Sequence, residues 1–274
     1  MLEGTQLGSN KSAHFKMKLL NRTGKITLPT RWQYWRVTLP LALLLIKSLK
    51  VTILLACPSA LLLGELPQYK GRTIAPVMSA TGADWLKRNE RKRMELPDKV
   101  VDALGLQPGM TVADVGAGIG YFTWRMAKRV GLEGRVLAVD IQIEMLECLK
   151  VELRKRHINN VEAVLGTPTN PRLPPNSVDL ALMVDVYHEF QHPEAMIAKI
   201  RDSLKKDGRM VLIEYRGEDP TVPIRSEHKM TTEQVLTEIL PMGFQLKNKL
   251  DFLPWQHIFI FKKIQQVKPL SKTH

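Results

Sequence analysis

One stretch constrains the fold of this chain more than any other, residues 112–120, which read VADVGAGIG. Its first half has the apolar composition of a buried strand, and its glycines stand where a helix is expected to begin. Glycine is needed where the backbone turns tightly or approaches a ligand without a Cβ in the way. The stretch therefore predicts a strand, a tight bend and a helix, the arrangement that starts a nucleotide-type site on an α/β sheet.

The glycines Gly116, Gly118 and Gly120 have the spacing GxGxG. A dinucleotide fingerprint, GxGxxG, would place its third glycine where this chain has Tyr121. A loop with this spacing suits a ligand that lacks a pyrophosphate. An acid, Asp140, closes the next expected strand some 20 residues later, where a carboxylate can accept both hydroxyls of a ribose.

Strand and helix patterns alternate along the rest of the chain. The expected strands are residues 111–115, 135–140, 161–165, 178–186, 209–215, 244–252 and 257–262, and the expected helices are residues 85–104, 121–130, 144–156, 193–204 and 232–240. Such alternation predicts a doubly wound, mainly parallel sheet with right-handed crossovers. Only residues 253–256 separate the last two strands, too few for a helical crossover, so these strands are expected to form an antiparallel hairpin at one edge.

The chain resembles the class I S-adenosylmethionine-dependent methyltransferases, in particular the small-molecule branch with the ubiquinone- and menaquinone-biosynthesis enzymes. The shared features are the glycine loop, the acid that follows it at a fixed spacing, the apolar central strand at residues 178–186 and the terminal hairpin. The resemblance covers residues 84–263 and is carried by DVGAGIG, VLAVD, LKKDGRMVLIEY and EQVLTEILPMGFQL. It implies an α/β fold with a Rossmann-like, doubly wound sheet of seven strands, in the order 3-2-1-4-5-7-6 with strand 7 antiparallel. It also implies S-adenosyl-L-methionine as the cofactor.

The same resemblance implies a set of cofactor-binding residues. Gly116, Gly118 and Gly120 would pack against the cofactor, Asp114 would support the loop, Asp140 would bind the ribose, Ile141 would lie against adenine, and Asp185 would lie near the methionine amino group. One departure concerns adenine. Many relatives have Gly-Asp after the third strand, whereas this chain has Gly166-Thr167, so a threonine hydroxyl or a backbone group would have to substitute.

The candidate catalytic residues are His188 and Glu189, just after the fourth strand. Methyl transfer depends largely on positioning, and an oxygen nucleophile also benefits from a general base. His188 has an ordinary pKa near neutrality, and Glu189 would either orient its imidazole or act as the base itself. The alternative is structural: both residues would only begin a loop and bond to the backbone of the next helix.

The segment after the fourth strand also limits the possible classes of methyl acceptor. It lacks the Asn/Asp-Pro-Pro-aromatic motif of DNA-adenine-type enzymes, and the domain has one cysteine, where arsenic methyltransferases need several. A small-molecule methyl acceptor, methylated on oxygen or carbon, remains by elimination. Two rivals stay open: a non-catalytic S-adenosylmethionine-binding protein, and an NAD-dependent oxidoreductase, which Tyr121 and the terminal hairpin disfavour.

The cysteines and the charge limit cofactors and partners. The chain has two cysteines and neither a CxxC pair nor a cysteine/histidine cluster, so no metal is expected, and Cys148 is expected to be buried in an amphipathic helix. Of the net charge of +13, residues 1–73 carry +9, with eleven Lys/Arg against two acids. Because a nucleic-acid-binding enzyme would carry its basic surface on the folded domain, no nucleic-acid partner is expected.

Four parts are expected along the chain. Residues 1–65 would be a basic and hydrophobic leader or membrane segment, residues 66–83 a linker, residues 84–263 the methyltransferase domain and residues 264–274 a C-terminal tail. The apolar stretch at residues 37–63 allows a signal anchor, an interfacial segment, a cleaved targeting sequence or a start codon placed too early. The expected location is cytoplasmic, where S-adenosylmethionine is found, with membrane association through residues 37–63 as an open alternative.

Substrate contacts are expected from two segments outside the sheet, residues 85–95 and residues 216–229. Trp85, Trp124 and Trp255 are candidates for an aromatic pocket, against the alternative that each is simply core. The charge run at residues 87–93 is expected to be a solvated helix face.

Overall fold

The computed structural model describes residues 66–264 of the 274-residue chain. The expected leader, with its apolar stretch at residues 37–63, lies outside the described residues, as does the expected tail from residue 265 onward. Among the helices of residues 66–264, none is both long and apolar enough to cross a membrane.

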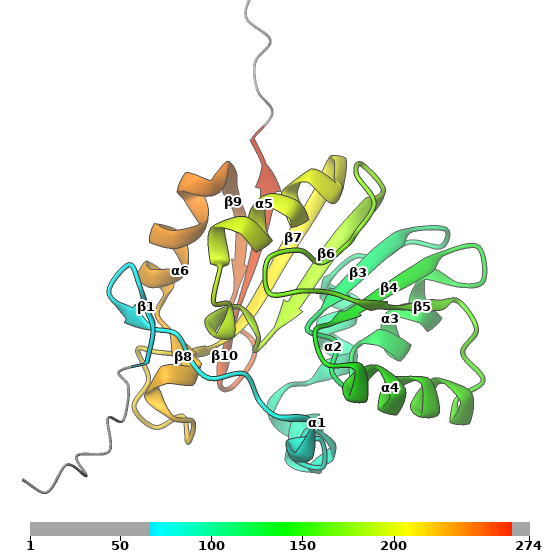
Figure 1. Cartoon of the computed structure of the whole chain (residues 1–274), viewed down its shortest axis with the longest axis horizontal. Coiled ribbons are helices and arrows are strands. Elements are labelled where there is room, and N and C mark those ends of the chain that lie inside the picture. The colour runs from blue at the N-terminus through cyan, green and yellow to red at the C-terminus, as the bar shows by residue number, and fades with distance from the viewer. Residues whose placement is uncertain (1–65, 265–274) are drawn as a thin grey trace, which may run out of the picture. The chain divides into compact units, whose positions relative to one another are not determined.

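A mixed eight-stranded sheet forms the centre of the domain, in the order β5-β4-β3-β6-β7-β10-β9 (Figure 1). Its strands are β3 (Thr111–Val115), β4 (Arg135–Asp140), β5 (Val161–Leu165), β6 (Val178–Val184), β7 (Leu204–Arg216), β9 (Phe244–Leu250) and β10 (Gln256–Lys263), and a short β8 (Lys229–Met230) pairs with β7. Strands β3 to β7 are parallel, and β10 is antiparallel to both of its neighbours. The expected order, 3-2-1-4-5-7-6 with an antiparallel strand 7, is confirmed.

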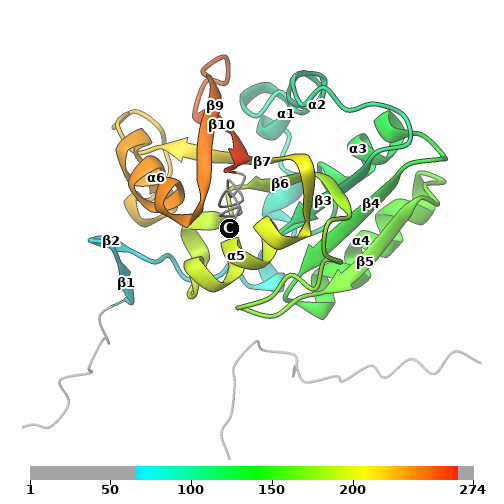
Figure 2. The same cartoon turned by 90° about the horizontal axis from the view of Figure 1, so that it is seen from above.

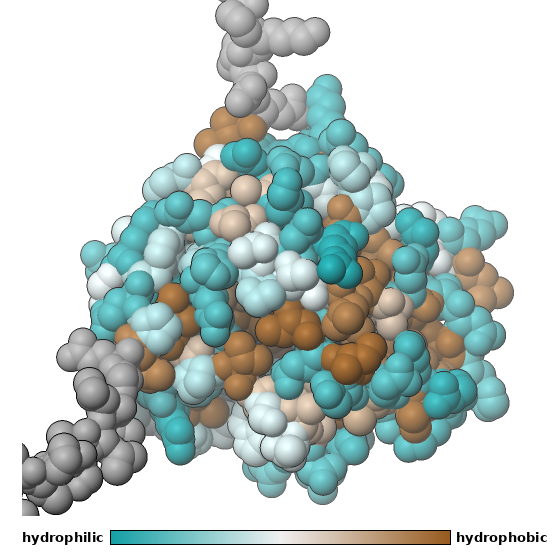
Figure 3. All heavy atoms as spheres, viewed as in Figure 1, coloured by the Kyte–Doolittle hydropathy of each residue, from teal (hydrophilic) through white to brown (hydrophobic). Residues whose placement is uncertain are grey.

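Helices cover both faces of this sheet (Figure 2). The helices are α1 (Glu90–Met94), α2 (Pro97–Ala103), α3 (Thr123–Val130), α4 (Ile143–Lys155), α5 (Pro193–Ser203) and α6 (Thr232–Ile239). Alternate strand residues enter different cores, because successive side chains of a strand point to opposite faces. Val112 packs in the core of α2 and α3, whereas Ala113 packs in the core of α5 and α6. The outer surface is mostly polar, with apolar surface gathered in the middle of the face drawn in Figure 3.

The helix expected over residues 85–104 is broken. It consists of a 3-10 turn at Trp85–Lys87 and the separate helices α1 and α2, and the break falls at Leu96, whose φ is +39°. Pro97 follows at the first position of α2. A proline has no N–H to donate and disfavours helical geometry in the residue before it, so a continuous helix is excluded here.

Two smaller expectations also fail. Cys148 is exposed, because the buried face of α4 consists of Met145, Leu146, Leu149 and Leu153, and position 148 lies off that face. Strand β7 begins at Leu204, ahead of the strand expected at residues 209–215, and its pairing with β6 shifts register in this first part.

Residues 66–83, expected as a linker, pack against the domain instead. A hairpin of β1 (Gln68–Tyr69) and β2 (Arg72–Thr73) leads into an extended segment in which Ile74 and Ala75 are buried. We call residues 66–79 the strap. Its glycines and prolines indicate irregular backbone, which does not preclude packing, and the apolar and basic residues between them supply the contacts.

Candidate functional site

A cavity of about 570 Å³ opens at the carboxyl ends of β3, β4 and β6. In doubly wound sheets, ligands bind at these strand ends, where the strand order reverses. Eight of the nine site residues expected from the sequence line it, namely Asp114, Gly116, Gly118, Asp140, Ile141, Asp185, His188 and Glu189. Gly120 is not among the lining residues.

The glycine bend has the left-handed backbone that its sequence suggests. The φ angles of Gly116 and Gly118 are +76° and +52°. A Cβ on Gly116 would lie 2.4 Å from Cγ2 of Val186, and one on Gly118 would lie 3.2 Å from Cδ1 of Leu86. At Gly120 the nearest atom to such a Cβ is 3.1 Å away, on Leu149 of α4. The bend is therefore compact. Gly116 and Gly118 leave room for side chains beside the cavity, and Gly120 leaves room for α4.

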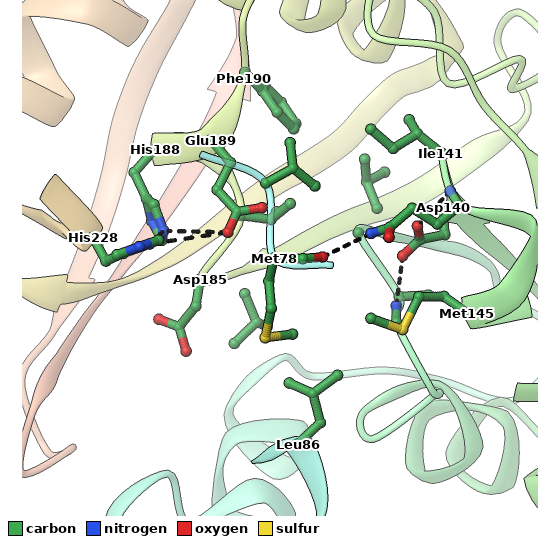
Figure 4. A pocket seen from close by; sticks show the side chains of 18 of the residues that line it. Met78, Leu86, Asp140, Ile141, Met145, Asp185, His188, Glu189, Phe190 and His228 are labelled. Atoms are coloured by element: carbon green, nitrogen blue, oxygen red, sulfur yellow. Dashed lines mark hydrogen bonds and ion pairs between the residues drawn. The ribbon is translucent and has the colours of Figure 1, made fainter. Parts of the chain in front are cut away.

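Asp140 joins the bend to the end of β4 (Figure 4). Its Oδ2 accepts the backbone N–H of Gly118 at 2.9 Å, and its Oδ1 accepts that of Gln142 at 2.9 Å. Burial raises the pKa of this carboxyl above its ordinary value. Because an ionised carboxylate has about four lone-pair sites, both oxygens can accept further hydrogen bonds from a ligand in the cavity.

Asp114 lies beneath the bend, at the end of β3. Its Oδ2 accepts the hydroxyl of Thr123, the first residue of α3, at 2.5 Å. Burial raises the pKa of Asp114 to about 6. This contact ties the strand before the bend to the helix after it.

Asp185 follows β6 in a left-handed conformation, with φ at +52°. Both of its carboxylate oxygens accept the side-chain amide of Gln256, at 2.9 and 2.8 Å. Burial, followed by the nearby carboxylates of Glu95 and Glu214, raises its pKa well above the ordinary value. Gln256 is the first residue of β10, and because β10 is antiparallel to β7, this residue lies at the sheet edge where the parallel strands end.

Arg91 shows that the charge run at residues 87–93 is not simply a solvated face. Its side chain is buried, lines the cavity and forms an ion pair with Glu95 at 2.7 Å. Its guanidinium carbon lies 3.8 Å from the ring centroid of Tyr121. The hydroxyl of Tyr121, a cavity-lining residue, is buried without a hydrogen-bond partner among residues 66–264. A polar group of a ligand would satisfy that hydroxyl.

The imidazole of His188 is held by an acid that the sequence did not single out. Its Nδ1 lies 2.6 Å from Oε2 of Glu214, and Oε1 of the same carboxylate accepts the backbone N–H of Tyr187 at 2.9 Å. Burial lowers the pKa of His188, but the carboxylate of Glu214 outweighs that effect and the net direction is upward. Glu189, which the sequence suggested as a residue that orients this imidazole, lies farther from it, with Oε1 4.0 Å from Nε2 of His188.

The backbone of His188 is held as firmly as its ring. Its carbonyl accepts Nη1 of Arg72 at 3.0 Å and the backbone N–H of Ala75 at 3.1 Å, both from the strap. On the ring, Nε2 lies 3.1 Å from Nδ1 of His228. Glu189 lies beside both rings, and burial raises its pKa to about 7. These contacts point into the cavity and to the strap, rather than to the helix that follows.

Sequence reasoning missed Glu214 and His228. Glu214 offered a signal, because it is a single acid within the apolar run MVLIEY of β7. His228 offered none beyond its place in the segment at residues 216–229, which was expected to cover the site. That segment does line the cavity, through Pro223, Ile224, Arg225 and His228, and so do Trp85 and Leu86. Trp124 and Trp255 do not belong to the lining.

Comparisons with known proteins agree with this geometry. Residues 112–208 match the family model described as a methyltransferase domain. The chain is 29% identical over 139 residues to nocamycin O-methyltransferase of Saccharothrix syringae, covering 51% of this chain and 47% of that protein. It is 28% identical over 116 residues to the ubiquinone/menaquinone biosynthesis C-methyltransferase of Shewanella pealeana, covering 42% of this chain and 46% of that one. It thus spans about half the length of these relatives.

A solved structure shares the fold. A SAM-dependent methyltransferase from Aquifex aeolicus matches with a TM-score of 0.64 at 24% identity, over 68% of this chain and 98% of that one. A further curated relative, the (S)-coclaurine N-methyltransferase of Thalictrum flavum subsp. glaucum, is 30% identical over 110 residues, or 40% of this chain and 30% of that protein.

Proposed function

From the match of residues 112–208 to a methyltransferase domain and the Rossmann-like order of the sheet, we propose that the chain transfers a methyl group from S-adenosyl-L-methionine to a small-molecule acceptor. The observation that carries the proposal is the carboxylate of Asp140, hydrogen-bonded to the glycine bend at the wall of the cavity. The cavity volume of about 570 Å³ lies within the roughly 300–1,000 Å³ of small-molecule sites.

The cofactor would lie along one half of the cavity. Asp140 would accept the ribose hydroxyls, Ile141 would lie against the adenine, and the bend with Gly116 and Gly118 would run alongside the sugar. The methionine end would reach Asp185, whose carboxylate suits an ammonium group. When bound, S-adenosylmethionine supplies an electrophilic sulfonium methyl; the protein's part is to hold that methyl in line with the acceptor.

The methionine carboxylate would lie near Arg91. The buried guanidinium of Arg91, which is paired with Glu95, and the hydroxyl of Tyr121, which has no partner among residues 66–264, supply hydrogen-bond donors on the same side of the cavity. A hydrogen bond to a charged group contributes about 1.5–3 kcal/mol. These two residues therefore extend the cofactor site beyond those that the glycine motif indicates.

The acceptor would occupy the other half, where His188 and Glu189 lie across the cavity from Asp140 (Figure 4). We assign these two residues to activation of the acceptor atom. An oxygen or carbon nucleophile must lose a proton to react, unlike a neutral amine, and this cluster of nitrogen and carboxylate groups favours such an acceptor. Phe190, Pro223 and Ile224 also line the cavity, which suits an acceptor with an apolar body.

The first test is the substitution Asp140→Ala. It removes the carboxylate that would bind the ribose, and loss of hydrogen bonds to a charged group should weaken binding of S-adenosylhomocysteine by about tenfold or more. The measurement is isothermal titration calorimetry on the full chain. Asp179→Ala is the matched control, because the carboxylate of Asp179 also accepts a backbone N–H, that of Thr111 at 2.9 Å, but does not line the cavity.

Equal affinity in the wild type and Asp140→Ala would refute the ribose assignment. Calorimetry with NAD in the same buffer separates the dinucleotide alternative, since the proposal expects binding of S-adenosylhomocysteine and none of NAD. A screen of phenolic, quinone-like and lipid acceptors with methyl-labelled S-adenosylmethionine then identifies the acceptor class.

A further inference from the structure

Three potential metal ligands meet at the acceptor end of the cavity. Nε2 of His188 and Nδ1 of His228 lie 3.1 Å apart, and Oε1 of Glu189 lies 4.0 Å from each of them (Figure 4). We call these three side chains the triad. They come from the turn after β6 and from the 3-10 turn at Ser226–His228, so the fold alone brings them together.

The spacing of these atoms matches a metal centre. A point equidistant from all three lies about 2.2 Å from each, at the upper end of the roughly 2.0–2.2 Å of Zn²⁺ bonds to histidine nitrogen and carboxylate oxygen. We propose that the triad binds one divalent transition-metal ion of the zinc type, through Nε2 of His188, Nδ1 of His228 and Oε1 of Glu189.

Glu214 supports the triad by holding the imidazole of His188 through its other ring nitrogen, Nδ1. A carboxylate accepts hydrogen bonds, so its 2.6 Å contact places the proton of the ring on Nδ1 of His188 and leaves Nε2 with a lone pair that can bind an ion. Metal-binding histidines commonly donate their other ring N–H to a carboxylate in this way, which fixes the tautomer and raises the basicity of the ligand atom. The side chain of Glu214 is completely buried, so it is held rigidly in this role.

The alternative to a metal is a proton shared by the two imidazoles. That proton would account for the 3.1 Å between the two rings, but it would leave the Glu189 carboxylate 4.0 Å from both, beyond hydrogen-bond distance. A cation at the centre of the triad would bond to all three side chains. It would also balance the charge of the buried Glu214 and the partly buried Glu189.

The ion would keep an open coordination position on the cavity side, because all three triad residues line the cavity. Three protein ligands with one open position are typical of catalytic sites, and two histidines with one carboxylate form a known ligand set for zinc and for iron(II). Such an ion would hold the oxygen of the methyl acceptor opposite the cofactor. This consequence rests on the proposed function, whereas metal binding itself does not.

The experiment is a Zn²⁺ titration of the full chain after removal of metals with a chelator, followed by calorimetry and, with Co²⁺ as probe, by visible absorption. We expect one ion per chain. His228→Ala and Glu189→Gln should lose the stoichiometric binding, and Glu214→Gln should weaken it by roughly 10–100-fold. His192→Ala is the matched control, since His192 is an exposed histidine that does not line the cavity, and it should bind as the wild type does.

His228 is the decisive position, because it is about a quarter exposed and its replacement should leave the fold intact, as circular dichroism would verify. Wild-type binding in folded His228→Ala, or no stoichiometric binding in the wild type, would overturn the proposal. Titration of S-adenosylhomocysteine on the same samples separates the two proposals. A wild-type protein that binds the nucleoside but not Zn²⁺ would refute the metal site alone, and one that binds Zn²⁺ but not the nucleoside would refute the cofactor assignment and leave the metal site standing.

Discussion

A side chain at position 116 would collide with a neighbour, because its Cβ would lie 2.4 Å from Cγ2 and 2.8 Å from Cβ of Val186. The backbone there is left-handed as well, which L-residues other than glycine rarely adopt. At this single residue, two independent reasons require glycine. The sequence motif predicts the glycine, but its packing partner comes from the turn after β6, far along the chain.

We expect Gly116→Ala to destabilise the protein by roughly 2–5 kcal/mol, from about 1–2 for the left-handed backbone and about 1–3 for overpacking. Urea unfolding measures this loss. Gly109→Ala is the matched control, because Gly109 has φ at +83° but nothing within 4 Å of an added Cβ, so only the backbone cost applies. Adding Val186→Ala to Gly116→Ala should recover part of the loss, and strict additivity of the two substitutions would argue against the collision.

At the scale of elements, the strap and α6 meet in a buried ion pair. Nε and Nη2 of Arg72 donate to the two oxygens of Glu238 at 2.7 and 3.1 Å, and both side chains are at most 4% exposed. The hydroxyl of Tyr187 donates to the same carboxylate at 2.8 Å. Because Arg72 also donates to the carbonyl of His188, this pair connects an N-terminal element to the turn that carries the candidate catalytic residues.

Arg72→Met should destabilise the protein by about 3–5 kcal/mol, because it leaves the Glu238 carboxylate buried without its counter-charge. The double variant Arg72→Met/Glu238→Gln should lose less than the single variant, since glutamine is neutral and can still accept the Tyr187 hydroxyl. Guanidinium unfolding of the wild type, Arg72→Met, Glu238→Gln and the double variant, in a double-mutant cycle, measures the difference. A double variant less stable than Arg72→Met would show that the ion pair is not the reason for the loss.

At the scale of the whole molecule, stability depends on pH through groups buried between the layers, and Asp114 is the clearest of them. Its pKa is about 6 in the folded protein against an ordinary value of 3.8. The folded state therefore binds the proton more tightly than the unfolded state between these two values. By linkage, the contribution of Asp114 to stability falls as the pH rises from about 4 to about 6 and is constant above that.

The expected size of this change is on the order of 3 kcal/mol, at about 1.4 kcal/mol per pKa unit. Asp114→Asn keeps an oxygen for the Thr123 hydroxyl but does not titrate, so the stability difference between wild type and variant should shift in favour of the variant over that pH range. Urea unfolding at several pH values from 4 to 7 provides the comparison. A difference that does not vary with pH would mean that burial does not raise the pKa of this group.

Local patterns along the chain determined most of the architecture. The strands expected at residues 111–115, 135–140 and 161–165 have the observed bounds of β3, β4 and β5, because apolar runs and glycine bends act over a few residues. The hairpin and the strand order followed from connection lengths and from the family resemblance. The break at Leu96 could also be predicted, because Pro97 is visible in the sequence. The helical periodicity of residues 85–104 nevertheless favoured a single helix.

The sequence by itself determined the glycine bend, Asp140 and the turn with His188 and Glu189, because each belongs to a contiguous motif at a strand end. Only the tertiary structure decided what surrounds them. Glu214 from β7, Gln256 from β10 and Arg72 from the strap bind residues of the cavity wall, and His228 from the covering segment lines the cavity itself, because the strands and loops pack side by side. Burial depends on neighbours that are distant in the chain, and burial is what raises the carboxyl pKa values in the site. No local sequence pattern contains this information.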